Sequence, residues 1–196
     1  MFTDEFKTID ARAEAVINDR GCRFLAVIAP VDTMGKAEEF IQQLKQEHPD
    51  LLDCVYAIRL GLASDRLERT EGSGQFGPVI LNILETEDVT NVVLAVVREA
   101  QDNVPKSASE QAFRDAGLNA LRRSKVVTRI LYDVLRFHIS RDDLETVSRL
   151  VTDNRGKVVQ TANTPDLVIS VKIRKIQAEA LEKILIEATH GRTKVV

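Results

Sequence analysis

One stretch of the sequence, residues 69–98, carries the residue types best suited to binding an anion. Its glycine-rich loop, residues 69–77, offers consecutive backbone N–H groups. The loop leads into an apolar segment in which Pro78 favours the start of a helix. Unpaired N–H groups at a helix start attract phosphate or carboxylate groups, and the helix dipole adds to this attraction. The candidate anion-binding residues are Arg69, Glu71, Gly72, Ser73, Gly74, Gly77 and Arg98.

A second interpretation of this loop is purely conformational. Glycine lets a surface loop turn at positive φ, and the loop has neither the lysine nor the spacing of a P-loop. Glu71 has no carboxylate or histidine partner nearby in the sequence, so a solvated charge explains it better than a catalytic acid does. We therefore predict no catalytic residue, and the anion-binding and conformational interpretations both stay open.

Two groups of basic residues are candidates for contact with a nucleic acid or a protein partner. Lysine and arginine side chains can bind RNA phosphates or the acidic face of a protein. For the first group a solvated linker is an equally good explanation, and the second lies on a predicted strand without aromatic residues, which argues against base stacking there. The first group is Arg122, Arg123, Lys125 and Arg129, and the second is Lys172 and Arg174.

The composition of the chain limits the classes of function that we expect for it. Of the 196 residues, 44% are hydrophobic and 29% are charged, which is enough apolar material for a packed core. No apolar run reaches the roughly 18 residues that cross a bilayer, and the start of the chain lacks the regions of a signal peptide. The three histidines lie far apart without ligands at metal spacing. We expect no membrane contact, no metal, no cofactor and a cytoplasmic location.

Charge and periodicity divide the chain near residue 125. Residues 1–125 hold 15 Lys and Arg against 21 Asp and Glu, a net charge of −6, whereas residues 126–196 hold 12 against 9, a net charge of +3. In the first part the apolar run Asn91–Val97 predicts a central strand covered on both faces. In the second part the patterns follow the order strand, helix, strand, strand, helix, which predicts a ferredoxin-like domain.

Several blocks of the first part resemble the IMPACT/YigZ family. They are Cys22-Arg23-Phe24-Leu25-Ala26, His48-Pro49, Cys54 to Gly61, the glycine-rich loop, and Thr90 to Arg98. The resemblance implies an α+β protein in which residues 1–125 form an α/β sandwich similar to a ribosomal-protein domain. It also implies that residues 126–196 form a ferredoxin-like domain similar to one in elongation factor G.

The glycine-rich loop departs from the family pattern. The family has two aspartates, a glycine, a glutamate and a proline before its serine and glycine, whereas here Thr70-Glu71-Gly72 runs directly into Ser73. The chain therefore resembles a diverged member.

The resemblance implies a non-enzymatic binding or regulatory protein that acts in translation through contact with the ribosome, RNA or a translation factor. Two alternatives stay open. One is an enzyme acting on a phosphorylated or nucleotide-like ligand at the glycine-rich loop, and the other is an interaction scaffold whose ancestral site has decayed. A homo-oligomer is compatible with each of them.

Overall fold

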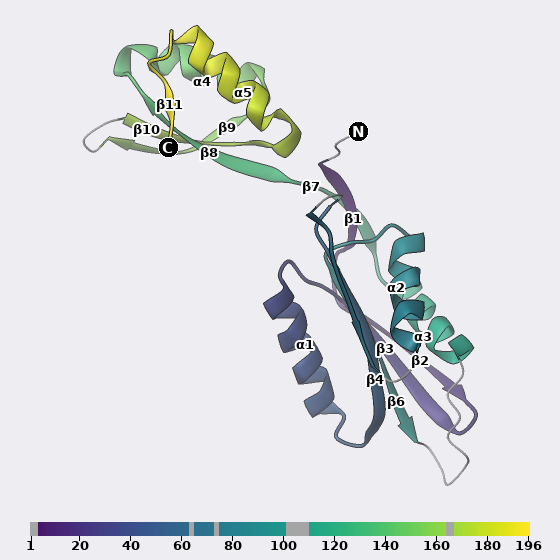
Figure 1. The fold of residues 1–196 in the computed structure, drawn as a ribbon. Coiled ribbons are helices and arrows are strands. Elements are labelled where there is room, and N and C mark those ends of the chain that lie inside the picture. The colour runs from purple at the N-terminus through teal and green to yellow at the C-terminus, as the bar shows by residue number, and fades with distance from the viewer. Residues whose placement is uncertain (1–3, 63–64, 73–74, 101–109, 164–166) are drawn as a thin grey trace. The chain divides into compact units, whose positions relative to one another are not determined.

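The computed structural model describes residues 4–62, 65–72, 75–100, 110–163 and 167–196 (Figure 1). The chain divides into two compact units. We call Phe6–Arg129 the N-terminal unit, and Ile130–Val196 with Met1–Glu5 the C-terminal unit. The assignment of residues 1–125 and 126–196 to an IMPACT-type and a ferredoxin-like domain stays a prediction.

The N-terminal unit is built on an antiparallel sheet of five strands. Across the sheet these strands are β2 (Ala13–Asp19), β3 (Cys22–Pro30), β6 (Val92–Ala100), β4 (Leu51–Leu60) and β5 (Leu67–Glu71). β6 lies at the centre, and its residues from Val92 to Val97 have no exposed surface. The predicted central strand is therefore confirmed, because a strand buried on both faces shows a continuous apolar run.

One face of this sheet is covered by α1 (Met34–Glu47), as Figure 1 shows. The Thr33 hydroxyl caps the helix by accepting a hydrogen bond from the Lys36 backbone N–H at 3.3 Å. Ala37, Ile41 and Leu44 recur at helical spacing and are buried against alternate residues of β3, β4 and β6.

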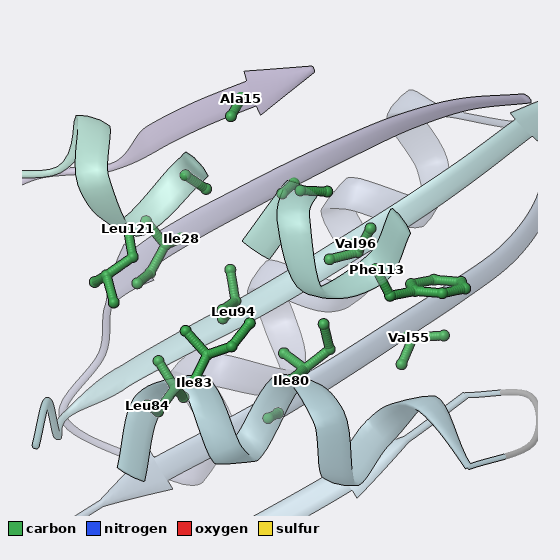
Figure 2. Packing of buried hydrophobic residues seen from close by; sticks show 14 of the residues in the cluster. Ala15, Ile28, Val55, Ile80, Ile83, Leu84, Leu94, Val96, Phe113 and Leu121 are labelled. Carbon is green, nitrogen blue, oxygen red and sulfur yellow. The ribbon is translucent and has the colours of Figure 1, made fainter. Parts of the chain in front are cut away.

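The opposite face is covered by α2 (Phe76–Thr86) and α3 (Glu110–Arg123). Phe113 of α3 packs edge-on against Phe24 at 5.2 Å between ring centroids and stacks on Phe76 at 4.5 Å. Figure 2 shows Ile80, Ile83 and Leu84 of α2 joining the same core as Val55, Leu94 and Val96 of the sheet. Successive strand residues point to opposite faces, so the sheet supplies both cores at once.

A two-stranded sheet pairs β1 (Glu5–Ile9) with β7 (Val126–Ile130). The division between the two units falls within both strands. α3 is described from Glu110 onward.

The C-terminal unit has a second antiparallel sheet, with strands in the order β11-β8-β10-β9. Its elements follow one another as β8 (Tyr132–Ile139), the short 3₁₀ helix η2 (Arg141–Asp143), α4 (Leu144–Asp153), β9 (Lys157–Asn163), β10 (Leu167–Arg174), α5 (Lys175–Ala188) and β11 (Lys194–Val195). The helices and strands alternate in the order on which the ferredoxin-like prediction rests. The predicted α+β fold class is confirmed.

Candidate functional site

The glycine-rich loop joins β5 to α2, and its two described glycines both approach neighbouring chain closely. Gly72 has a φ of +133°, and a Cβ built on it would lie 2.7 Å from the Cα of Val55. A Cβ on Gly77 would lie 2.9 Å from the Cβ of Thr70. Both distances leave no room for a side chain, so packing alone requires glycine at these two positions. Ser73 and Gly74 lie outside the described residues, and anion binding by the loop stays a prediction.

Arg69 and Glu71 lie on the face of the sheet that α1 covers. Arg69 forms an ion pair with Glu38 of α1 at 2.6 Å and with Glu71 at 3.4 Å. The buried Tyr56 hydroxyl donates a hydrogen bond of 2.5 Å to a Glu71 carboxylate oxygen. Both sequence candidates are therefore held by protein partners.

The hydrogen bond between Tyr56 and Glu71 moves the pKa values of the two side chains in opposite directions. The hydrogen bond from Tyr56 lowers the pKa of Glu71, whereas burial and then the bond to Glu71 raise the pKa of Tyr56 to about 12. A general acid must carry a proton at working pH, and Glu71 is instead stabilised as a carboxylate. This protonation state argues against Glu71 as a general acid, and the absence of a catalytic role stays a prediction.

Arg98 lies on the other face of the sheet. It pairs across the sheet with Phe24 and with Asp53, and Phe24 belongs to the core under α2 and α3. Arg69 pairs with Ile58, which belongs to the core under α1. The sequence grouped the two arginines at one anion site, but the register of three strands places their side chains on opposite faces.

The basic group at residues 122–129 is exposed and anchored at its ends. Arg122 and Arg123 form the last turn of α3 rather than a linker, and Arg123 donates a hydrogen bond of 3.3 Å to the carbonyl oxygen of Glu14. Lys125 and Arg129 both approach the Asp10 carboxylate, at 3.9 Å and 3.7 Å. Ion pairs as exposed as these contribute about 0–1 kcal/mol, so the side chains remain accessible to a partner.

Lys172 and Arg174 extend from the same face of β10 but differ in their surroundings. Arg174 binds the Asp4 carboxylate through two hydrogen bonds, of 2.6 Å and 3.0 Å, and the Glu5 carboxylate at 2.9 Å. These bonds raise the pKa of Arg174 and lower that of Asp4. The Lys172 ammonium lies 4.6 Å from the ring centroid of Tyr132. Of the two predicted residues, Lys172 is therefore the one available to a ligand.

Part of the N-terminal unit is similar to a known domain family. Residues 20–99 match the model of the Impact N-terminal domain, a range that includes β3, α1, β4, the glycine-rich loop and α2. This part of the chain is similar to the Impact N-terminal domain. The resemblance to the IMPACT/YigZ family that the sequence predicts is confirmed. No curated protein is significantly similar to the chain in sequence.

Three solved structures resemble the chain. The first is the crystal structure of a hypothetical protein, with a TM-score of 0.66, 17% identity and coverage of 100% of this chain and 98% of that chain. The translational regulator Yih1 has a TM-score of 0.39, 19% identity and coverage of 59% and 48%. A protein from Thermus thermophilus has a TM-score of 0.43, 14% identity and coverage of 100% and 29%. Of these, the first shows a shared fold along the whole chain.

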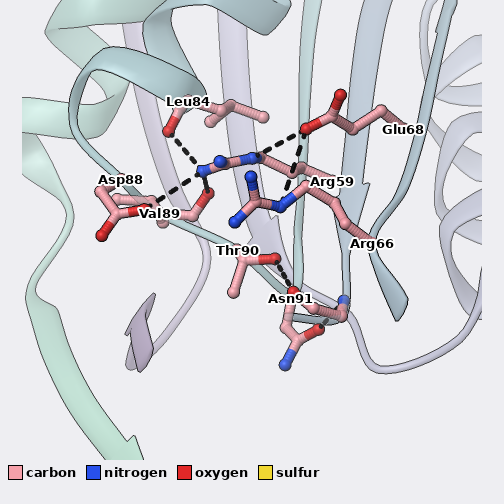
Figure 3. A network of polar contacts seen from close by, with 9 residues as sticks. Arg59, Arg66, Glu68, Leu84, Asp88, Val89, Thr90 and Asn91 are labelled. Carbon is pink, nitrogen blue, oxygen red and sulfur yellow. Dashed lines mark hydrogen bonds and ion pairs between the residues drawn. The ribbon is translucent and has the colours of Figure 1, made fainter. Parts of the chain in front are cut away.

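The matched range, residues 20–99, also contains a buried arginine that the sequence reasoning missed. Arg59 is 3% exposed, and its guanidinium donates to the carbonyl oxygens of Leu84 at 3.1 Å and Val89 at 3.0 Å (Figure 3). Its Nε also binds Glu68 at 3.1 Å. Leu84 lies in the last turn of α2 and Val89 follows the helix, so Arg59 joins β4 to the end of α2 and to the segment after it. The available signal was one arginine within the apolar strand 55–60.

A second cluster in the matched range joins residues far apart in sequence. The Glu99 carboxylate contacts Arg23 at 2.6 Å and the Nδ1 of His48 at 2.7 Å. Burial acts to raise the pKa of Glu99, but the bonds from Arg23 and His48 outweigh it and leave the pKa below its usual value. The cluster ties the end of α1 to β3 and β6.

The described residues contain no group of three or more His, Cys, Asp or Glu side chains arranged to hold a metal ion. Among the helices in the described ranges, none is long and apolar enough to cross a membrane.

Proposed function

We propose that this chain is a regulatory protein of the IMPACT type that acts in translation by binding rather than by catalysis. Its contact in translation is the ribosome, an RNA or a translation factor. The observation that carries the proposal is the match of residues 20–99 to the Impact N-terminal domain. Action in translation implies a cytoplasmic location, which is part of the proposal.

The chemistry at the glycine-rich loop supports binding over catalysis. Glu71 is held as a carboxylate by Tyr56, and Arg69 is paired with Glu38. Arg98 extends from the opposite face of the sheet and does not join them. An enzyme acting on a phosphorylated ligand at this loop would need these groups converging on one substrate, so this alternative gains no support from the described residues.

Sedimentation in a translation extract tests the proposal. The purified full chain is added at low salt to the extract, the mixture is separated on a sucrose gradient, and the chain is detected by immunoblot. We expect it to leave its free position and to sediment with ribosomes or with a smaller complex, and ribonuclease treatment identifies contacts that depend on RNA. A chain that stays at its free position in every gradient would contradict the proposal.

A screen of metabolites tests the enzyme alternative. A ligand that binds only the folded state raises the melting temperature in proportion to the logarithm of its concentration. A rise with a phosphorylated metabolite, together with its turnover, would favour the enzyme alternative.

A further inference from the structure

The sheet of the C-terminal unit has one covered and one open face. Alternate residues of β8 and β10, such as Phe137, Ile169 and Val171, pack with residues of α4 and α5 into the core of this unit. Among the residues between them, Val134, Arg136 and Lys172 are exposed, whereas Ser170 is buried. Strand residues alternate between faces, so these exposed residues share the face opposite the helices.

Positive charge collects on this open face. The strand registers bring its residues together: Lys157 lies opposite Lys172, Arg136 opposite Ser170, and Lys194 opposite His138. In the described parts of the four strands, no Asp or Glu points to this side, because Asp133 lies opposite the buried Ile173. The cationic residues of the open face are Arg136, Lys157, Lys172, Arg174 and Lys194.

Four of these five charges are available to a partner. Arg174 is neutralised by Asp4 and Glu5. Arg136, Lys157 and Lys194 are exposed, and within the described residues they lie in no ion pair. Lys172 also lies in no ion pair within the described residues, and its ammonium lies beside the Tyr132 ring. Since the whole protein has a net charge of −3, this concentration of positive charge is local to the face.

We infer that the open face of the C-terminal sheet binds single-stranded RNA through its phosphates. The inference rests on the proposed function and deepens it by naming the partner. The four available cations lie on strands whose described residues turn no carboxylate to this side, and such a surface complements a phosphodiester backbone. Tyr132 is 46% exposed at one end of the face, beside Lys172, and offers a surface on which an unpaired base can stack. In a duplex the bases are already stacked on one another, so the single strand is the better fit.

The four charges set the expected salt dependence. For a single strand, the logarithm of affinity falls with the logarithm of salt concentration with a slope of about −0.7 per neutralised phosphate. Four contacts therefore predict a slope of about −3, and between roughly 50 and 200 mM salt the affinity should fall roughly 50-fold. With one aromatic residue on the face, we expect little sequence preference.

Fluorescence anisotropy of the full chain with a labelled oligouridylate of about 16 nucleotides tests the inference. The variant Arg136→Gln/Lys157→Gln/Lys194→Gln should bind at least tenfold more weakly at low salt, with its slope reduced to about −0.7. The control variant Arg141→Gln/Arg149→Gln/Lys183→Gln removes the same charge from η2, α4 and α5, and it should bind as the wild type does. Tyr132→Ala should weaken binding about tenfold through lost stacking.

Several outcomes would overturn the inference. Wild-type affinity in the first variant, or an equal loss in the control variant, would show that the open face is not the site. Tighter binding of duplex RNA would refute the single-stranded assignment. Equal binding of polyglutamate, unaffected by Tyr132→Ala, would instead assign the face to an acidic protein.

The experiments can refute the RNA inference and the proposed function independently of each other. If the chain binds no oligouridylate but still sediments with ribosomes after ribonuclease treatment, the RNA inference fails and the proposed function stands. If it binds RNA through this face but never leaves its free position in a translation extract, the proposed function fails and the inference stands.

Discussion

Replacing Gly72 with alanine separates the two interpretations of the glycine-rich loop. The new Cβ would lie 2.7 Å from the Cα of Val55 and 2.8 Å from its Cγ2, in the buried part of β4. At a φ of +133° the backbone itself costs an L residue about 1–3 kcal/mol, and overpacking adds a similar amount. We expect Gly72→Ala to lower the free energy of unfolding of the N-terminal unit by about 3 kcal/mol or more.

Hydrogen exchange read on peptides of β4 measures this loss without interference from the C-terminal unit. Each 1.4 kcal/mol is a factor of ten in an equilibrium constant, so 3 kcal/mol accelerates exchange by roughly 100-fold. Gly35→Ala is the matched control, because no atom lies within 4 Å of its added Cβ and alanine is favoured in α1 by up to about 1 kcal/mol. Unchanged exchange in Gly72→Ala, with loss of a phosphate-induced rise in melting temperature, would refute the packing argument and favour anion binding.

Three further predictions follow from buried polar contacts. Arg59→Ala removes the buried guanidinium that binds the Leu84 and Val89 carbonyls and Glu68, and we expect a loss of about 3–5 kcal/mol in unfolding free energy, measured by exchange of α2 peptides. The partly exposed Arg66→Ala, whose contact with Glu68 is 3.9 Å, should cost under about 0.5 kcal/mol, and equal losses in the two variants would contradict the role of Arg59. In a Tyr132→Phe chain, Tyr56 is the one remaining tyrosine, and tyrosinate absorbance should give a pKa of about 12. The stability from the raised pKa of Tyr56 is complete below pH 10.0 and is lost as pH rises through 12, whereas a midpoint at 10.0 would exclude the bond to Glu71. Asp4→Asn should destabilise the C-terminal unit by about 1–3 kcal/mol at neutral pH, because it weakens the paired bonds to Arg174. Since the pKa of Asp4 is lowered, the wild-type advantage should disappear as pH falls below 3.8 in acid unfolding, and an advantage that persists there would contradict the assignment.

Local sequence patterns predicted the strands named here. The apolar run at 91–97 predicted the central strand because both of its faces are buried, and the strand predicted at Lys172 and Arg174 matches β10. Arg69 and Arg98 could not be separated in this way. Their faces depend on how β4, β5 and β6 pair, and no local pattern contains that register.

The residues of the candidate sites were also only partly predictable, because strand pairing brings them together. Lys172 was found from its place on an alternating strand, but Arg136, Lys157 and Lys194 join it through the pairing of β8, β9 and β11 within one sheet. Asp4 neutralises Arg174 across 170 positions of sequence, so the loss of one predicted RNA contact is visible only in the fold.

The rate of protein synthesis in a cell-free system tests the central claim most directly. Increasing amounts of the full chain are added to a reporter translation reaction, with an unrelated acidic protein of similar size as the control. The account predicts a dose-dependent, saturable change in reporter synthesis that the control protein does not produce. A synthesis rate that stays constant up to a chain concentration equal to that of the ribosomes would contradict a role in translation.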